Sequence, residues 1–477
     1  MGNTTGFLDH LRVTGTYRPV RSRLKDYKEF TNQLDQNMLK IQGSRCMDCG
    51  IPYCHAMGCP LGNLIPEWND SVYNGNWREA LIRLESTNNL PEITGRICPA
   101  PCEASCTLSI NDAPVTLKQI ELAIIEYGFN QGWISASPPE VETGKKVAVI
   151  GSGPAGLAAA QQLRRFGHSV TVYEKSEKAG GILRYGIPDF KLEKWVIDRR
   201  LNQMYDEGVQ FETNVNIGKD ISARYLKKNF DAILITMGAG EPRNLDIEGR
   251  KLNGVHFAME YLIESNKLIS GEIAASQQKI NAKGKNILVI GGGDTGSDCV
   301  GTANRQGASQ VYQFEIMPKP LEWKESWNPN WPYWPLILRT SSSHEEGCKR
   351  DWSVQTSRFI GKNGKIEEVE FVRVKWEQTK ENGVPKPVEI PGSKFSLKID
   401  LVFLATGFLH IEHNKFLEDL ELKLDQRGNV MLDENFSTSS PGVFVAGDSA
   451  TGASLVVRAI SHGRKAAEAI NQQLKSL

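Results

Sequence analysis

The 477-residue sequence lacks the features that mark several specialised classes of protein. Its formal net charge is zero, from 56 basic and 56 acidic side chains, so charge gives no reason to expect binding to nucleic acid or to an anionic membrane surface. No apolar run approaches the length that spans a bilayer. The opening residues MGNTTGFLDH lack the apolar core of a signal peptide and, at Gly6, the Ser or Thr of a myristoylation motif. We therefore expect a cytoplasmic protein that binds neither nucleic acid nor a membrane.

Cysteine is sparse along most of the chain and concentrated in two short stretches, CMDCGIPYCHAMGC and CPAPCEASC. Seven of the nine cysteines lie there: Cys46, Cys49, Cys54, Cys59, Cys98, Cys102 and Cys106. Thiols stay reduced in the cytoplasm, which argues against disulfides. Zinc and iron–sulfur clusters both take thiolate ligands. A proline follows Cys59 and Cys98, as in bacterial ferredoxin motifs, and this favours iron–sulfur, with zinc as the alternative.

Two segments repeat an apolar strand, a glycine turn, a helix and a second strand: KKVAVIGSGPAGLAAAQQLRRFGHSVTVYEK and KNILVIGGGDTGSDCVGTANRQGASQVYQFE. In each turn the first glycine allows a tight bend, the second lets a pyrophosphate approach, and the third lets helix and strand pack closely. Each second strand ends in an acid placed to accept from ribose hydroxyls. The pattern predicts two dinucleotide sites, built on Gly151, Gly153, Gly156 and Glu174, and on Gly291, Gly293, Gly296 and Glu315.

Two dinucleotide sites in one chain indicate a flavoprotein that takes hydride from a nicotinamide. The later stretch GVFVAGD places Asp448 at a strand end, where it is suited to hold the ribityl hydroxyls of a flavin, and TGASLVVRAISHG is expected to start a helix facing the flavin ring. After Gly151 the only cysteines are Cys299 and Cys348, too isolated to suggest a redox pair. Electrons must leave to oxygen, to a diffusible acceptor or to another centre, and the last option favours iron–sulfur.

Several stretches together resemble a known family: CPLGNLIPEWND, GGILRYGIPDFKL, the two glycine turns and GVFVAGD are similar to the small (beta) subunit of glutamate synthase. The similarity extends over nearly the whole chain, and related electron-input modules occur in dihydropyrimidine dehydrogenase and in bifurcating ferredoxin–NADP oxidoreductases. It implies an α/β flavoprotein of the pyridine nucleotide oxidoreductase type. The expected domains are a helical iron–sulfur domain (1–140), a discontinuous Rossmann-like FAD domain (145–280 and 400–477) and a Rossmann-like NAD(P)H domain (281–399), with a linker at 135–144.

The resemblance also implies two [4Fe–4S] clusters with interleaved ligands. One would be held by Cys46, Cys49, Cys54 and Cys106. The other would be held by Cys59, Cys98, Cys102 and, in APVTLKQIELAI, Glu121. Without the resemblance, Glu121 would be interpreted as a solvated helix glutamate. The gap between Cys54 and Cys59 is longer than in some relatives, so the resemblance does not predict the conformation of this loop.

The residues expected to bind the two nucleotides follow from the same comparison. FAD is assigned Gly151, Gly153, Pro154, Ala155, Gly156, Glu174, Gly181, Leu183, Gly447, Asp448 and Val456. NADPH or NADH is assigned Gly291, Gly293, Asp294, Thr295, Gly296 and Glu315. No catalytic acid or base is expected, because hydride transfer depends on alignment of the two rings. A carboxylate at Glu315 with no arginine directly after it favours NADH, although Lys319 is near enough in sequence to pair with a phosphate.

By this resemblance the chain is the electron-input half of a hetero-oligomer. It would oxidise NAD(P)H at FAD and pass electrons through the clusters to a large (alpha) subunit, which in this family makes L-glutamate from L-glutamine and 2-oxoglutarate. The alternatives are a stand-alone or bifurcating NAD(P)H:ferredoxin oxidoreductase and a non-enzymatic iron–sulfur scaffold. His55, His410 and His413 are interpreted as surface residues. The stretch LEWKESWNPNWPYW is interpreted as a packed insertion, or alternatively as a lid or a contact with the large subunit.

Overall fold

The computed structural model describes residues 3–378 and 384–476. The N-terminal part is a helical domain in which α8 packs against α5 and α6. Its core is formed by large apolar side chains such as Trp68, Leu84 and Ile125, all at most 1% exposed. Its helices are α1 (Gly6–Asp9), α2 (Val20–Arg23), α3 (Gln36–Ser44), η1 (Cys54–Gly58), α4 (Ile65–Tyr73), α5 (Trp77–Thr87), α6 (Pro91–Ile97), α7 (Pro101–Ala104), η2 (Thr107–Ile110) and α8 (Leu117–Asn130). The predicted linker, 135–144, contains neither helix nor strand.

The first nucleotide turn lies in a five-stranded parallel sheet of order β14-β4-β1-β2-β3. Central strands such as β1 are buried on both faces because helices cover both, which explains their continuous apolar sequence. The strands are β1 (Lys146–Ile150), β2 (Ser169–Tyr173), β3 (Gln210–Glu212), β4 (Ala232–Ile235) and β14 (Val443–Val445). The helices are α9 (Pro154–Arg165), α10 (Ile182–Tyr185), α11 (Lys194–Asp206), α12 (Ala223–Asn229), α16 (Lys415–Asp419), α17 (Asp448–Thr451) and α18 (Val456–Lys475).

The second nucleotide turn lies in another five-stranded parallel sheet, of order β5-β13-β6-β7-β8. Its elements are β5 (Val255–Phe257), α13 (Ala258–Ile269), η3 (Ala275–Gln277), β6 (Asn286–Ile290), α14 (Asp294–Arg305), β7 (Gln310–Glu315), α15 (Ser342–Glu345), β8 (Lys349–Trp352) and β13 (Leu401–Leu404). A smaller antiparallel sheet follows β8, and the sequence patterns did not predict it. It contains β9 (Val354–Lys362), β10 (Lys365–Glu377), β11 (Lys386–Glu389) and β12 (Phe395–Lys398).

Strand pairing shifts the boundaries expected between the two nucleotide domains. β13 pairs with β5 on one side and with β6 on the other, so β5 and β13 both belong to the second sheet. The boundaries predicted at 280 and 400 therefore cut through that sheet. The reason is physical: LVFL followed by a glycine stop identifies a buried strand, but such a pattern carries no information on which of two parallel sheets the strand joins.

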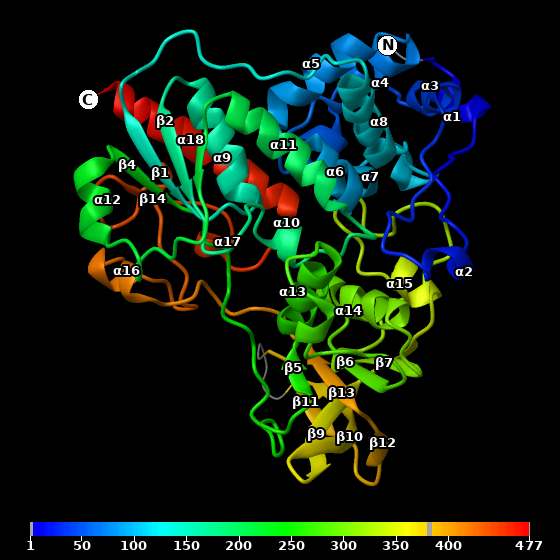
Figure 1. The fold of residues 1–477 in the computed structure, drawn as a ribbon. Coiled ribbons are helices and arrows are strands. Elements are labelled where there is room, and N and C mark those ends of the chain that lie inside the picture. The colour runs from blue at the N-terminus through cyan, green and yellow to red at the C-terminus, as the bar shows by residue number, and fades with distance from the viewer. Residues whose placement is uncertain (1–2, 379–383, 477) are drawn as a thin grey trace.

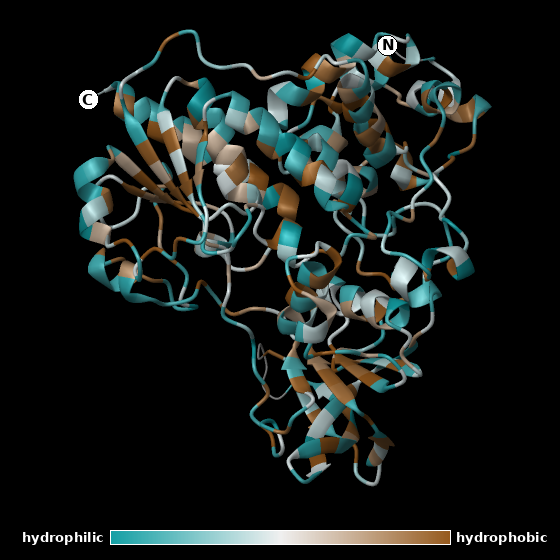
Figure 2. Ribbon diagram, viewed as in Figure 1, coloured by the Kyte–Doolittle hydropathy of each residue, from teal (hydrophilic) through white to brown (hydrophobic). Residues whose placement is uncertain are grey.

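Figure 1 shows the three parts side by side, with the helical domain next to α11 of the first sheet and the second sheet projecting away, the antiparallel strands at its tip. Figure 2 shows apolar residues along the strands of the two parallel sheets and also on several helices. Buried ion pairs join the parts: Arg200 of α11 meets Glu92 of α6, and Arg23 of α2 meets Glu346 beside α15. Within the described residues, no helix is long and apolar enough to cross a bilayer.

Candidate functional site

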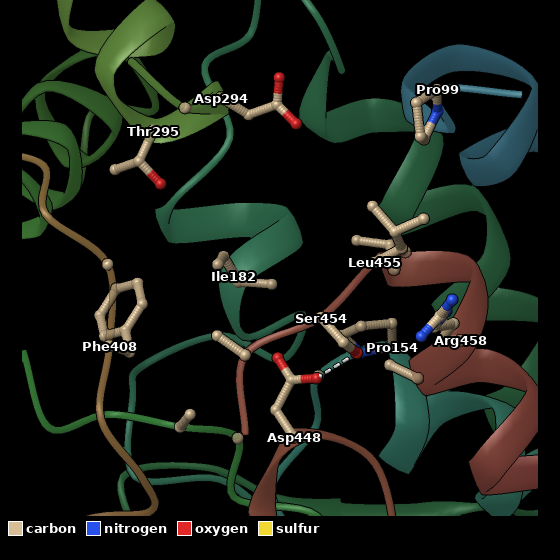
Figure 3. Close-up of a pocket in the computed structure, with 18 of the residues that line it drawn as sticks. Pro99, Pro154, Ile182, Asp294, Thr295, Phe408, Asp448, Ser454, Leu455 and Arg458 are labelled. Carbon is tan, nitrogen blue, oxygen red and sulfur yellow. Dashed lines mark hydrogen bonds between the residues drawn. The ribbon is translucent and has the colours of Figure 1, made fainter. Parts of the chain in front are cut away.

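One large cavity, of about 1650 Å³, lies where the three parts meet. The turn around Gly153 lines it from the first sheet, the turn around Gly293 from the second, and Pro60 and Pro99 from the helical domain. Figure 3 shows side chains from all three parts pointing into this space. Both predicted dinucleotide sites therefore open into the same cavity.

The first glycine turn leaves room for a ligand at one position only. Gly151 has φ +102°, a conformation that side chains rarely adopt, and a Cβ on Gly156 would lie 2.0 Å from the Gly151 carbonyl oxygen. A Cβ on Gly153 would meet nothing within 4 Å, and Gly153 lines the cavity at the start of α9. The free N–H groups of this helix start and the empty space beside it suit a pyrophosphate.

The second turn repeats this geometry. Gly291 has φ +119°, a Cβ on Gly296 would lie 2.5 Å from the Gly291 carbonyl oxygen, and a Cβ on Gly293 would again meet nothing within 4 Å. Asp294 and Thr295 open α14 and line the cavity beside it. The two turns thus present two helix starts of the same backbone geometry, each with space beside its second glycine.

The acid that follows each turn folds back onto it. Glu174 is buried, and its Oε2 accepts from the N–H of Ser152 at 3.2 Å and from the Ser152 hydroxyl at 2.5 Å. In the second turn, Oε2 of Glu315 accepts from the N–H of Gly292 at 2.6 Å, and its Oε1 accepts from the N–H of Met317 at 3.1 Å. Both acids line the cavity, where a ribose adjoining the pyrophosphate would lie.

The C-terminal strand brings a third acid to the first site. Asp448 begins α17, lines the cavity and accepts from the Ser454 hydroxyl at 2.7 Å, a bond drawn in Figure 3. Burial raises the pKa of Asp448 above its ordinary value. Val456 starts α18 on the same wall, followed by Arg458, which no motif identified.

Some residues expected to bind FAD also serve packing, and Gly181 among them lines the cavity. The side chain of Leu183 is fully buried in the core of the first domain and does not line the cavity; its neighbour Ile182 does. A four-residue helix turns consecutive side chains to different faces, so the assignment of Leu183 to FAD stays a prediction for its backbone. A Cβ on Gly181 would lie 2.8 Å from Cα of Gly153, and one on Gly447 would lie 2.9 Å from Cβ of Ala155. These two glycines permit close approach to the first turn.

Four thiols surround a small separate cavity in the helical domain. They are Cys46, Cys49, Cys54 and Cys106, the first set expected from the sequence. Burial raises the pKa of Cys46 to about 11 and also raises the pKa of Cys54 and Cys106, because each thiolate would lie in an apolar setting near other thiolates. None of the cysteines among the described residues is in a disulfide.

The other three of the seven N-terminal cysteines, Cys59, Cys98 and Cys102, lie around Glu121. Burial raises the pKa of Cys59 to about 11 and of Cys98 to about 12, and the Glu121 charge adds to both; Cys102 is also raised, by burial and by its neighbours. Glu121 is only 6% exposed, so its interpretation as a solvated helix glutamate was wrong. Its Oε1 accepts from Asn88 at 3.1 Å and from the Thr94 hydroxyl, and burial raises its pKa to about 7.

The donor set fits clusters better than single ions. In the described part of the chain, no three His, Cys, Asp or Glu residues stand close enough to hold one metal ion. A tetrahedral zinc ion would bring sulfurs to within about 3.8 Å of each other, whereas an iron–sulfur cluster holds its thiolates around a larger body. Soft, buried thiols in two sets suit iron–sulfur chemistry, because a cluster neutralises charges that would otherwise be costly to bury.

Other residues singled out in the sequence have structural environments. Cys299 is fully buried in the core of the second domain, far in sequence from half-buried Cys348. The rings of His410 and His413 stack at 4.2 Å, and each ring bonds a backbone carbonyl. Phe408, after β13, lines the main cavity and was missed because nothing in its local sequence marks it.

Comparison with known proteins agrees with this geometry. Residues 145–463 match the family model described as pyridine nucleotide-disulphide oxidoreductase, and residues 23–133 match the one described as dihydropyrimidine dehydrogenase domain II, 4Fe-4S cluster. The fold of FprA from Mycobacterium tuberculosis superposes with a TM-score of 0.56 at 17% identity, covering 70% of this chain and 85% of that one. The chain is thus an iron–sulfur member of the pyridine nucleotide oxidoreductase class.

Full-length relatives define the family more narrowly. The chain is 52% identical to the glutamate synthase [NADPH] small chain of Mycobacterium tuberculosis, over 99% of this chain and 96% of that protein. It is 45% identical to the small chain of Bacillus subtilis, over 99% of both. It also aligns over 99% of its length with 22% of the glutamate synthase [NADH] of Saccharomyces cerevisiae, at 43% identity. The chain belongs to the glutamate synthase small-chain family.

Proposed function

We propose that this chain is the electron-input subunit of glutamate synthase, oxidising NAD(P)H and delivering the electrons through iron–sulfur clusters. One observation carries the proposal. Both nucleotide turns line one cavity, and residues next to the second cysteine set line the same cavity. Pro60 follows Cys59, Pro99 follows Cys98, and both prolines line the cavity wall. Nucleotide sites and cluster site are therefore neighbours.

The residues of the first site would hold FAD. The start of α9 and the space beside Gly153 would take the pyrophosphate, Glu174 the ribose hydroxyls and Asp448 the ribityl chain. When bound, FAD accepts a hydride as two electrons and releases them singly. The cavity walls would position the ring, and hydride transfer would then depend on alignment rather than on an acid or a base.

The residues of the second site would hold the nicotinamide nucleotide. The start of α14 beside Gly293 would take its pyrophosphate, and Glu315 would meet the adenosine ribose. Because the second turn lines the same cavity as the first, this cavity would hold the nicotinamide and flavin rings together. The preference for NADH inferred from Glu315 stays a prediction.

The two cysteine sets would hold two [4Fe–4S] clusters. Cys46, Cys49, Cys54 and Cys106 would ligate one through four sulfurs. Cys59, Cys98, Cys102 and the Glu121 carboxylate would ligate the other, with Thr94 and Asn88 orienting the carboxylate. A carboxylate oxygen in place of a fourth sulfur would give this cluster a different ligand field and a different potential.

The electron acceptor in this proposal is a large subunit that makes L-glutamate from L-glutamine and 2-oxoglutarate. The yeast relative supports the arrangement, because there the whole of this chain corresponds to 22% of a longer protein named glutamate synthase. The bacterial relatives are each named as a small chain, which implies a larger one. We place the complex in the cytoplasm, where thiol-ligated clusters persist.

Anaerobic purification followed by two assays tests the proposal. The chain alone is expected to carry about one FAD and about eight irons, to lose its flavin absorbance on addition of NAD(P)H and to reduce ferricyanide. Together with the large subunit it should form glutamate from glutamine and 2-oxoglutarate. Rapid reduction of ferredoxin without the partner would instead indicate a stand-alone oxidoreductase. Failure of NAD(P)H to bleach the flavin would instead favour the non-enzymatic iron–sulfur scaffold.

A further inference from the structure

The tryptophan-rich stretch of the second domain is anchored in a different domain. We define the Trp segment as residues 321–340, which connect β7 with α15. In Figure 1 the yellow-green connection before α15 runs up to the helical domain. The sequence left open whether this stretch is a packed insertion, a lid or a contact with a partner, and the structure shows it packed against this chain's own cysteine loops.

Trp331 makes the central contact. Its indole N–H donates to the carbonyl oxygen of Cys106 at 3.1 Å and to that of Ser105 at 3.3 Å. Its ring packs on Tyr53, with ring centroids 4.8 Å apart. Tyr53 immediately precedes Cys54, so one side chain touches both stretches of the chain that bring Cys54 and Cys106 to the small cavity.

Further hydrogen bonds hold the same loop on both sides of Cys106. The Asn328 N–H donates to the Ser109 carbonyl at 2.6 Å, and the Asn328 side-chain amide donates to the Ala104 carbonyl at 2.8 Å. In the opposite direction, the Ser105 hydroxyl donates to the Pro332 carbonyl at 2.7 Å. Asn328 is buried, so these bonds form away from competing water.

The Trp segment also forms a wall of the nucleotide cavity. Pro332, Tyr333 and Trp334 line it, as does Asp294 at the start of α14. The Trp segment therefore contacts the Cys106 loop and also lines the nucleotide cavity.

We propose that Trp331 is a positioning residue for the iron–sulfur centre to which Cys106 belongs. It acts from the nicotinamide domain by fixing the backbone on which Cys106 and Cys54 stand. The argument rests on the proposed function only in requiring that a cluster forms at this cysteine set. Groups that hold a metal ligand in place affect both how firmly the metal is held and its potential.

The test compares Trp331→Phe with Trp327→Phe in the holoenzyme. Phenylalanine keeps a ring against Tyr53 but removes the indole donor. Trp327 lies in the same segment and packs edge-to-face against Trp323, with ring centroids 4.6 Å apart. Its indole N–H makes no hydrogen bond in the described structure, so it is the matched control. Trp331→Phe should release iron to a chelator about fivefold faster, the factor expected for one lost net hydrogen bond. The EPR signal or potential of one cluster should change, while FAD content and NAD(P)H-driven flavin bleaching stay as in wild type.

A second variant removes the contact from the other side. Ser105→Ala deletes the hydroxyl that donates to Pro332 and should accelerate iron release in the same direction. It also keeps the test decisive if Trp331→Phe does not fold. Equal iron release and an unchanged EPR spectrum in wild type, Trp331→Phe and Ser105→Ala would overturn the proposal, as would equal acceleration in Trp327→Phe. Loss of flavin bleaching with intact clusters would count against the proposed function instead.

Discussion

Replacing Gly153 by valine is expected to separate flavin binding from folding. The backbone at Gly153 has φ −67° and ψ −177°, an extended conformation that any residue adopts, and a Cβ there meets nothing within 4 Å. The folded state thus tolerates the side chain. Removing a glycine also restricts the unfolded chain, which stabilises by about 0.4–1 kcal/mol. The new side chain instead fills the space through which the pyrophosphate must approach.

Gly156→Ala, three residues further along, is the matched control with the opposite expectation. Its Cβ would lie 2.0 Å from the Gly151 carbonyl oxygen and 2.8 Å from the Thr236 hydroxyl oxygen. Such overpacking costs about 1–3 kcal/mol. The two variants should therefore differ by at least about 1.4 kcal/mol, which for a domain of this size corresponds to about 3–6 °C in melting temperature.

The assay measures flavin absorbance, iron content and melting temperature together. Bound flavin itself stabilises the folded state, so the melting temperatures of both variants must be compared with that of deflavinated wild type. Gly153→Val is expected to melt near deflavinated wild type, to keep its iron and to lack flavin. Full flavin occupancy in Gly153→Val would refute the assignment of the first turn. A melting temperature as low as that of Gly156→Ala would refute the claim that the space beside Gly153 is open.

Three further changes test other parts of the site. Glu121→Ala should lose or alter one cluster and spare the other, and unchanged iron content with an unchanged EPR spectrum would show that the carboxylate is not a ligand. Glu315→Gln should raise the ratio of kcat/KM for NADPH to that for NADH, because it removes a charge that repels the 2′-phosphate; a strong wild-type preference for NADPH that the variant leaves unmoved would show that the acid does not read the nucleotide. Arg200→Met leaves Glu92 as a buried, unpaired carboxylate and should destabilise the contact between α11 and α6 by about 3–5 kcal/mol, measured by denaturant unfolding. The control is Arg83→Met, which removes an exposed ion pair and should change the unfolding free energy little.

The sequence predicted the parts of the site whose chemistry depends on local spacing. The turns at Gly151 and Gly291 require particular residues at fixed offsets, so the pattern alone located both helix starts. The cysteine sets came from the family resemblance, and the structure brings together the same side chains.

What the sequence did not predict depends on contacts between distant segments. The sheet to which β13 belongs is decided by its pairing with β5 and β6, across more than a hundred residues of chain. The hydrogen bond from Trp331 to Cys106 joins positions 225 residues apart. Phe408 has no special local sequence and lines the cavity only because the connection after β13 passes there. Local patterns contain no information on such long-range neighbours.

The interleaving of the two sheets affects the order in which the chain can fold as it is made. β4 ends at Ile235, and its neighbour β14 begins at Val443, 208 residues later (443 − 235). At about 5–20 residues per second, a ribosome needs about 10–40 s to produce the intervening chain. During that interval the apolar β4 has an unpaired edge of the kind that recruits other strands. The second domain can complete its own sheet while the first sheet still lacks β14. The nascent chain therefore has to shield the edge of β4 until β14 emerges. A complete flavin site cannot form before that point.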